Sequence, residues 1–267
     1  MTFRLVGRRV LVTGASRGIG RALAHEFAAN GARLALVARS GGELTELAQQ
    51  LGGAAYAVDL SEPTQVRGLV AAIEDDAGPV DVLVNNAGIE MAGHLLDASA
   101  ADLEALYRLN LVTPVELCRQ VLPGMLARRR GHIVAMSSLA GVATFPGLAA
   151  YGSTKAGLTH LTSGIRADLR GTPVGTTLVE IGPVATQMME RATQYAPTRD
   201  AFARMYRLRL LRQISAQDVA RATVAAVQTG QRHVRLPRRV AFAAALIETP
   251  RRTAEFLLTG VPHQERP

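Results

Sequence analysis

The chain has 267 residues, of which 48% are hydrophobic and 19% charged, enough apolar sequence for the core of one large domain. Its formal net charge is +8, but aromatic residues make up only 4% and tryptophan is absent, so few side chains can stack on nucleic-acid bases. The arginine clusters fall on no recognisable nucleic-acid-reading motif, which argues against nucleic acid as the main partner.

The composition also bears on the compartment. The single cysteine, Cys118, excludes an internal disulfide and is typical of a reducing cytosol. The N-terminal apolar run has no cleavage-like site after it. The longest late apolar run, residues 240–247, is far short of the roughly 20 residues that cross a bilayer. We therefore expect a cytoplasmic protein.

Short, almost wholly apolar runs alternate along the chain with segments of helical spacing. The runs predict strands over residues 8–14, 32–39, 54–60, 80–88, 131–138, 174–182 and 233–237. Helices are expected between them, one of them over 63–78, with starts signalled by Ser61, Ser99 and Ser215. This alternation predicts an α/β fold, a doubly wound parallel sheet of the Rossmann type with helices on both faces.

The chain shows no interdomain linker. Residues 1–240 are expected to form one Rossmann-type domain that binds the cofactor and carries the catalytic residues. A helical insertion is expected at 187–213, and residues 241–267 are expected to form a short helical tail.

The exit of the first strand reads TGASRGIG, residues 13–20. Its glycines let the backbone turn tightly and approach a pyrophosphate at the N-terminus of the next helix. The turn predicts cofactor contacts by Gly14, Ser16, Arg17, Gly18, Ile19 and Gly20. A purely structural glycine turn is the alternative.

The exit of the second strand bears on which cofactor is preferred. An NAD-selecting site places a carboxylate there, but this strand ends in Arg39 and Ser40. Arg39 and Arg17 could hold a 2′-phosphate by charge-assisted hydrogen bonds. We therefore predict NADP(H) rather than NAD(H), the alternative being that Arg39 is a solvated surface residue.

Later exits complete a recognisable series. The fourth strand ends in NNAG, the fifth ends at Ser138, and Tyr151 and Lys155 stand four residues apart, on one face of a helix. With the glycine turn, these motifs in this order and spacing resemble the single-domain branch of the short-chain dehydrogenase/reductase family. The resemblance covers about residues 7–240.

The resemblance implies a catalytic set of Asn110, Ser138, Tyr151 and Lys155. Tyr151 would give a proton to a carbonyl oxygen while the nicotinamide gives hydride to its carbon, and Ser138 would polarise the carbonyl. Asn110 would hold a water in the proton relay. Lys155 would bind the nicotinamide ribose and lower the pKa of the tyrosine.

The resemblance also implies further cofactor contacts. These are Asp59 and Leu60 at the adenine, Asn86, Ala87 and Gly88 beside the cofactor, Thr186 at the carboxamide and Lys155 at the ribose, with Val184 and Tyr151 as further cofactor contacts. Ile181 departs from the family pattern, which usually has proline at that position.

Lys155 is the only lysine of the chain. A tyrosine has an ordinary pKa of about 10, and a nearby ammonium group favours its phenolate. Arginine would supply charge too, but its planar fork is bulkier and does not release a proton. The isolated lysine therefore indicates a chemical role rather than chance.

The remaining features are less specific. The six histidines have no metal-ligand spacing, so no metal site is expected. The insertion at 187–213 mixes methionine, tyrosine and leucine with arginine, which suits a mobile lid over an apolar substrate, or equally an ordinary surface helix pair.

The expected function is an NADP-dependent carbonyl reductase or alcohol dehydrogenase. Its substrate would be a small ketone, aldehyde or alcohol of apolar type, such as a lipid, steroid or acyl compound, and the family resemblance implies a homodimer or homotetramer. A catalytically inactive cofactor-binding regulator need not keep Ser138, Tyr151 and Lys155 together, and a nucleotide-sugar epimerase would add a larger C-terminal domain. A membrane-surface lipid-associated protein of the same fold is the third alternative.

The C-terminal segment 238–267 carries two short apolar groups flanked by arginine pairs. Two short amphipathic helices of this kind could lie on an anionic membrane surface, giving the protein a peripheral membrane contact. The same pattern suits helices that pack over the pocket or across a subunit interface.

Overall fold

The structure is a computed structural model that describes residues 3–237. Seven parallel strands form one sheet in the order β3-β2-β1-β4-β5-β6-β7. Their bounds are β1 (Arg9–Thr13), β2 (Arg33–Ala38), β3 (Ala54–Ala57), β4 (Val80–Asn85), β5 (Gly131–Ser138), β6 (Val174–Ile181) and β7 (His233–Leu236). The expected doubly wound parallel sheet is confirmed.

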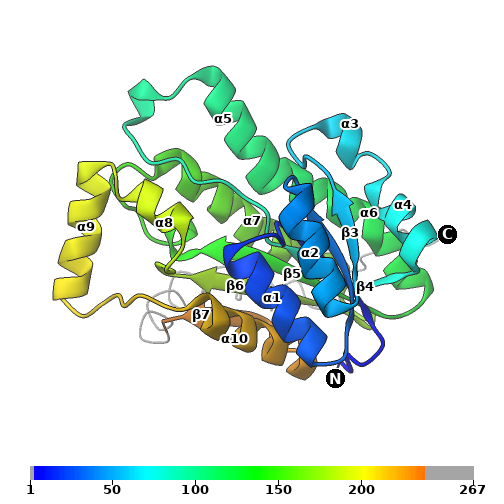
Figure 1. Cartoon of the computed structure of the whole chain (residues 1–267). Coiled ribbons are helices and arrows are strands. Elements are labelled where there is room, and N and C mark those ends of the chain that lie inside the picture. The colour runs from blue at the N-terminus through cyan, green and yellow to red at the C-terminus, as the bar shows by residue number, and fades with distance from the viewer. Residues whose placement is uncertain (1–2, 238–267) are drawn as a thin grey trace.

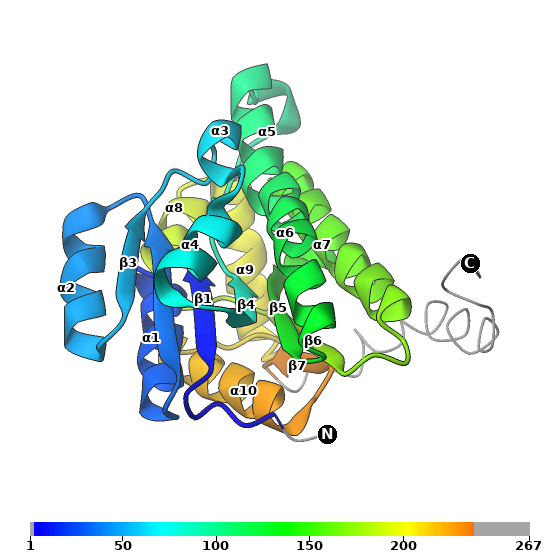
Figure 2. The ribbon, with the colours of Figure 1, turned by 90° about the vertical axis from the view of Figure 1, so that its right-hand side faces the viewer.

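Helices cover both faces of this sheet (Figures 1 and 2). They are α1 (Gly18–Ala29), α2 (Gly41–Leu51), α3 (Pro63–Val66), α4 (Leu69–Ala77), α5 (Ala100–Tyr107), α6 (Thr113–Ala127), α7 (Ala149–Asp168), α8 (Gln187–Ala192), α9 (Ala196–Arg207) and α10 (Ala216–Thr229). One core lies between the sheet and α1, α2 and α10, and a second between the sheet and α4 and α6.

The apolar character of the strands follows from this double cover. All six residues of β4 are buried, as are four of the five in β1. A strand with helices on both faces has no solvent-facing side, so its sequence does not alternate. Among the described helices, none has the length and apolarity needed to cross a bilayer.

Some boundaries differ from expectation: β3 ends at Ala57 rather than at residue 60, and β4 ends at Asn85 rather than at residue 88. The segment predicted as a single helix over 63–78 is two helices, α3 and α4. Gly68 separates them with a φ of 73°, a conformation that glycine adopts without steric cost. Ser61 does not cap a helix, because α3 begins after Glu62. The caps predicted at Ser99 and Ser215 are confirmed: their side chains accept hydrogen bonds from the N–H groups of Asp102 and Asp218.

The order of the strands locates a binding crevice. From β1 the chain proceeds to β2 and β3 on one side, and from β4 to β7 on the other. In open α/β sheets, ligands bind where the order reverses, outside the carboxyl ends of the strands. The exits of β1, β4, β5 and β6 are therefore the segments that can build a site.

Candidate active site

Two glycines of the turn after β1, Gly14 and Gly20, have no room for a side chain. A Cβ on Gly20 would lie 2.0 Å from the carbonyl oxygen of Gly14, and one on Gly14 would lie 2.9 Å from Cα of Ala87. No side chain caps the start of α1. The first N–H groups of that helix can therefore bind an anion such as a dinucleotide's diphosphate.

Thr13, at the end of β1, joins this turn to the exit of β4. Its Oγ1 accepts hydrogen bonds from the N–H groups of Asn86 (2.9 Å) and Ala87 (3.0 Å), and donates to the carbonyl of Val84 at 3.0 Å. The side-chain amide of Asn86 donates to the carbonyl of Thr13 at 2.9 Å. Sequence reasoning placed Thr13 in the motif but gave it no role.

The residues expected at the adenosine end lie at the exits of β2 and β3. Arg39 is exposed at the end of β2, and it forms no ion pair within the described residues. Asp59 accepts a hydrogen bond from the N–H of Ser61 at 2.9 Å, and Leu60 is buried. Ser16 is buried and Arg17 exposed in the glycine turn.

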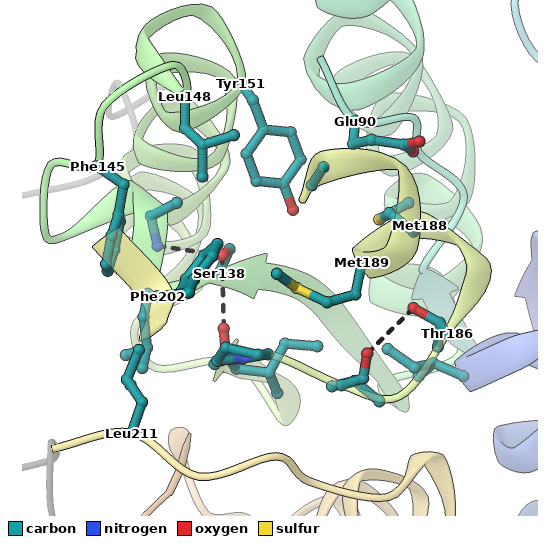
Figure 3. A pocket seen from close by; sticks show the side chains of 18 residues that line it. Glu90, Ser138, Phe145, Leu148, Tyr151, Thr186, Met188, Met189, Phe202 and Leu211 are labelled. Atoms are coloured by element: carbon teal, nitrogen blue, oxygen red, sulfur yellow. Dashed lines mark hydrogen bonds between the residues drawn. The ribbon is translucent and has the colours of Figure 1, made fainter. Parts of the chain in front are cut away.

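Ser138 ends β5, and Tyr151 lies in the first turn of α7. Both side chains line one cleft, and the Ser138 hydroxyl favours the ionised form of Tyr151. The Ser138 Oγ also accepts from the N–H of Ala140 at 3.1 Å and donates to the carbonyl of Ile181 at 3.4 Å. Figure 3 shows the Tyr151 hydroxyl pointing into the cavity.

Lys155 lies one turn after Tyr151 on α7 and is buried, with 7% of its surface exposed. Its Nζ donates a hydrogen bond to the carbonyl of Met136 at 3.0 Å and lies 5.7 Å from the centre of the Tyr151 ring. Burial lowers the pKa of Lys155 to about 8, because a buried ammonium loses its hydration.

The pKa of Tyr151 moves opposite to expectation. Burial raises it to about 12, Glu90 adds to the rise, and the hydrogen bond with Ser138 opposes it. Lys155 is not among the groups that shift the pKa of Tyr151, and its ammonium donates its hydrogen bond to the Met136 carbonyl instead. Loss of phenolate hydration outweighs the hydrogen bond.

Asn110 is fully buried in a π-helical turn, Arg108–Val112. Its side chain accepts from the N–H of Ile89 and donates to the carbonyl of Ile89, both at 2.9 Å, and also donates to Thr154 at 3.2 Å. A Cβ on Gly88 would lie 3.0 Å from Asn110 Oδ1 and 3.6 Å from Lys155 Nζ. Asn110 thus fixes the loop after β4 beside Lys155. The Thr154 partner was not anticipated.

The loop after β6 closes the site from the other side. Thr186 precedes α8 and donates a hydrogen bond to the carbonyl of Val184 at 3.3 Å. A Cβ on Gly18 would lie 3.6 Å from the methyl group of Thr186, so this loop meets the glycine turn. The structure therefore brings the turn, the catalytic candidates and the carboxamide candidates to one edge of the sheet.

A cleft with an empty volume of about 680 Å³, including its open mouth, adjoins the two hydroxyls. Most of its lining is apolar, and α8 and α9 supply Met188, Met189 and Phe202. Phe202 stacks on Phe145 with ring centres 5.1 Å apart. Glu90 is the one carboxylate among the lining residues; burial raises its pKa, and Arg191 lies 4.0 Å away. Sequence reasoning did not identify Glu90, because nothing in the pattern marks it.

The comparisons with known proteins agree with this geometry. Residues 8–196 match the family model described as short chain dehydrogenase. The chain is 38% identical over 186 residues to the Ketoacyl reductase HetN of Nostoc sp., covering 68% of this chain and 65% of that protein. It is 34% identical over 190 residues to Dehydrogenase/reductase SDR family member 7B of Bos taurus, covering 67% and 58%. Both matches span less than two thirds of the relative.

Solved structures match over nearly the whole chain. A short-chain dehydrogenase from Sphingobium yanoikuyae in complex with NADPH gives a TM-score of 0.79 at 26% identity, covering 97% of this chain and 98% of that one. A short chain dehydrogenase/reductase from Burkholderia phymatum in complex with NAD gives 0.80 at 26% identity, covering 99% of each. From its fold, its nucleotide-binding turn and these matches, the chain belongs to the short-chain dehydrogenase/reductase family of oxidoreductases.

Proposed function

We propose that this protein is an NADP(H)-dependent reductase that interconverts an apolar ketone or aldehyde with the corresponding alcohol. The observation that carries the proposal is that Ser138 and Tyr151 line the same apolar cleft, with Lys155 Nζ 5.7 Å from the centre of the Tyr151 ring. An apolar lining binds a substrate by excluding water, and the few polar groups orient it.

The nicotinamide, when bound, exchanges a hydride with the carbonyl carbon. Tyr151 donates its proton to the carbonyl oxygen, and Ser138 hydrogen-bonds the same oxygen. A pKa of about 12 keeps Tyr151 protonated at neutral pH, as a proton donor requires. Lys155, with a pKa of about 8, gains and loses protons near neutrality and can return one to the tyrosine.

The cofactor is held by the glycine turn, the loop after β4 and the loop after β6. Its 2′-phosphate would be bound by Arg39 and Arg17, since the exit of β2 carries no carboxylate. The structural neighbours include both NADPH and NAD complexes, so the preference for NADP(H) rests on these two arginines.

A panel of ketones, aldehydes and alcohols tests the proposal, with turnover read from the absorbance of NADPH. Tyr151→Phe should lose turnover by at least about 100-fold with the best substrate, because it removes the proton donor and keeps the ring. NADPH binding by the variant, measured by fluorescence titration, should stay within a few fold of the unmodified protein. Equal turnover in the variant would overturn the mechanism, and binding of NADPH without turnover of any substrate would instead favour a regulatory role.

A further inference from the structure

The end of α9 and the turn after it, residues 204–212, form a surface that we name the lid tip. Its inward side closes the pocket: Leu211 packs in one cluster with Phe202, and Met205 packs against them. Its outward side exposes apolar side chains, with Tyr206 37%, Leu208 57% and Leu210 48% accessible. The lid tip therefore has two apolar sides, one packed against the pocket and one facing solvent.

The exposed apolar residues alternate with positive charge. Arg204, Arg207, Arg209 and Arg212 are all exposed, and none forms an ion pair with any residue in the described range 3–237. The sequence from 201 to 217 contains no aspartate or glutamate. The lid tip thus presents four arginines without compensating negative charge.

The backbone of the lid tip has a further special feature. Arg209 has a φ of 56°, in the left-handed region that residues other than glycine seldom adopt. It lies between Leu208 and Leu210, and both leucines remain exposed on either side of it. In Figure 1 α9 lies at the left-hand edge of the molecule, outside the helices that cover the sheet. The turn is thus at the periphery, where a large flat partner can reach it.

We propose that the lid tip binds the surface of an anionic lipid bilayer. Guanidinium groups are attracted to anionic headgroups, while leucines between them can enter the acyl boundary and the tyrosine can stay at headgroup depth. A bilayer surface accommodates both kinds of side chain without a matching shape, which suits a single helix end and turn. Nucleic acid would use the arginines but leave the leucines in water.

The position of the lid tip gives this contact a consequence. Leu211 lines the pocket, and its neighbour Leu210 is exposed on the lid tip. An apolar carbonyl compound dissolved in the bilayer could then enter the cleft beside α9 without crossing water. This consequence rests on the proposed reductase function, whereas the membrane contact itself does not.

Flotation of the full chain with vesicles tests the contact. Vesicles of phosphatidylcholine with one quarter phosphatidylglycerol should carry the protein upward at low salt, and pure phosphatidylcholine should carry much less. The double variants Leu208→Ser with Leu210→Ser, and Arg204→Gln with Arg207→Gln, should each lower the partition coefficient, the arginine pair by about 30-fold. Val6→Ser with Arg33→Gln is the matched control, because both are exposed at the opposite edge of the sheet, and it should float as the unmodified protein does.

Two results would overturn the proposal: failure of the unmodified chain to float with anionic vesicles at low salt, or equal flotation of the lid-tip variants. The second result would place the membrane contact elsewhere in the chain. Turnover of a water-soluble ketone without vesicles is measured in parallel. Absence of turnover would count against the reductase function alone. Normal turnover by variants that fail to float would show that the lid tip serves membrane binding and not catalysis.

Discussion

Tyr151 and Lys155 stand one helical turn apart on α7, yet burial moves their pKa values in opposite directions, to about 12 and about 8. Each shift favours the neutral form, because each charged form loses hydration. The pair can therefore hold and exchange protons near neutrality without bearing two charges in a closed site.

The space around Lys155 explains why arginine is not equivalent there. The ammonium binds the carbonyl of Met136, and the side chain is buried with Gly88 as a neighbour, where a Cβ would lie at contact distance, 3.6 Å, from Nζ. A guanidinium is larger and stays charged at every accessible pH. Lys155→Arg should therefore lower kcat by at least about 100-fold and also weaken NADPH binding.

Steady-state kinetics and NADPH titration check this prediction, with thermal melting to show that the variant is folded. A variant with ordinary turnover would mean that only the charge of Lys155 matters.

The proposed preference for NADP(H) rests largely on Arg39. Arg39→Asp would replace a cation by a carboxylate at the exit of β2, repelling a 2′-phosphate and favouring ribose hydroxyls. We expect NADPH affinity to fall by about 10- to 100-fold, and the ratio of NADH to NADPH affinity to rise.

Titration of both cofactors measures this change. Arg33→Asp is the matched control, since Arg33 is exposed at the opposite end of the same strand. A similar loss in both variants would attribute the effect to net charge, and tighter binding of NADH than NADPH by the unmodified protein would contradict the assignment of Arg39.

At the scale of elements, sequence patterns predicted the sheet because apolar runs record burial on both faces. They also predicted Ser138 at the end of β5 and Tyr151 on the following helix, because residue types and spacing are local. The break at Gly68 was not predicted, since the sequence pattern does not show whether a glycine within a helical segment adopts a positive φ. The role of Thr154 and the place of Glu90 depend on contacts between distant segments, which no local pattern records.

The pKa of Tyr151 could not be predicted for a related reason. Spacing placed Lys155 beside the tyrosine correctly, but the direction of the shift depends on how completely both groups are buried and where the ammonium binds. The tail, residues 238–267, lies outside the described residues, so its expected helices stay a prediction.

Strand β5 carries another buried titratable group, His132, at the end opposite Ser138. His132 is 3% exposed, its Nε2 lies 2.8 Å from Thr177 Oγ1, and burial lowers its pKa to about 4, with Arg166 contributing. The pKa of His132 in the folded protein is below the ordinary value of 6.5. As the pH falls, the unfolded chain therefore takes up the proton at a higher pH than the folded protein does. The contribution of His132 to the free energy of unfolding is therefore fully present above pH 6.5 and is lost as the pH falls toward 4.

Urea unfolding at pH 7 and pH 4.5 measures this loss. Between pH 7 and pH 4.5, the free energy of unfolding should fall by about 2 kcal/mol more in the unmodified protein than in His132→Gln. This value follows because a shift of one pKa unit corresponds to about 1.36 kcal/mol. The difference between the two proteins removes the contribution of other titrating groups. Parallel pH dependence in both would show that His132 does not titrate on unfolding.

At the scale of the whole molecule, the site is assembled from segments far apart in the sequence. The glycine turn, the loop after β4, the end of β5, α7 and the loop after β6 meet at one edge of the sheet. Under the proposed function, a cofactor bound there would contact most of these segments in the folded state, whereas the unfolded chain does not bring them together. Its binding should therefore stabilise the entire domain.

The size of that stabilisation follows from mass action. NADPH at 100 times its dissociation constant should raise the free energy of unfolding by about 2.7 kcal/mol, or the melting temperature by about 5–10 °C for a domain of this size. NADH at the same concentration should give a smaller rise. Tyr151→Phe should keep most of the NADPH shift, because its hydroxyl serves proton transfer, while Arg39→Asp should lose much of it. A larger shift with NADH, or no shift with either nucleotide, would contradict the proposed cofactor site even if the fold is correct.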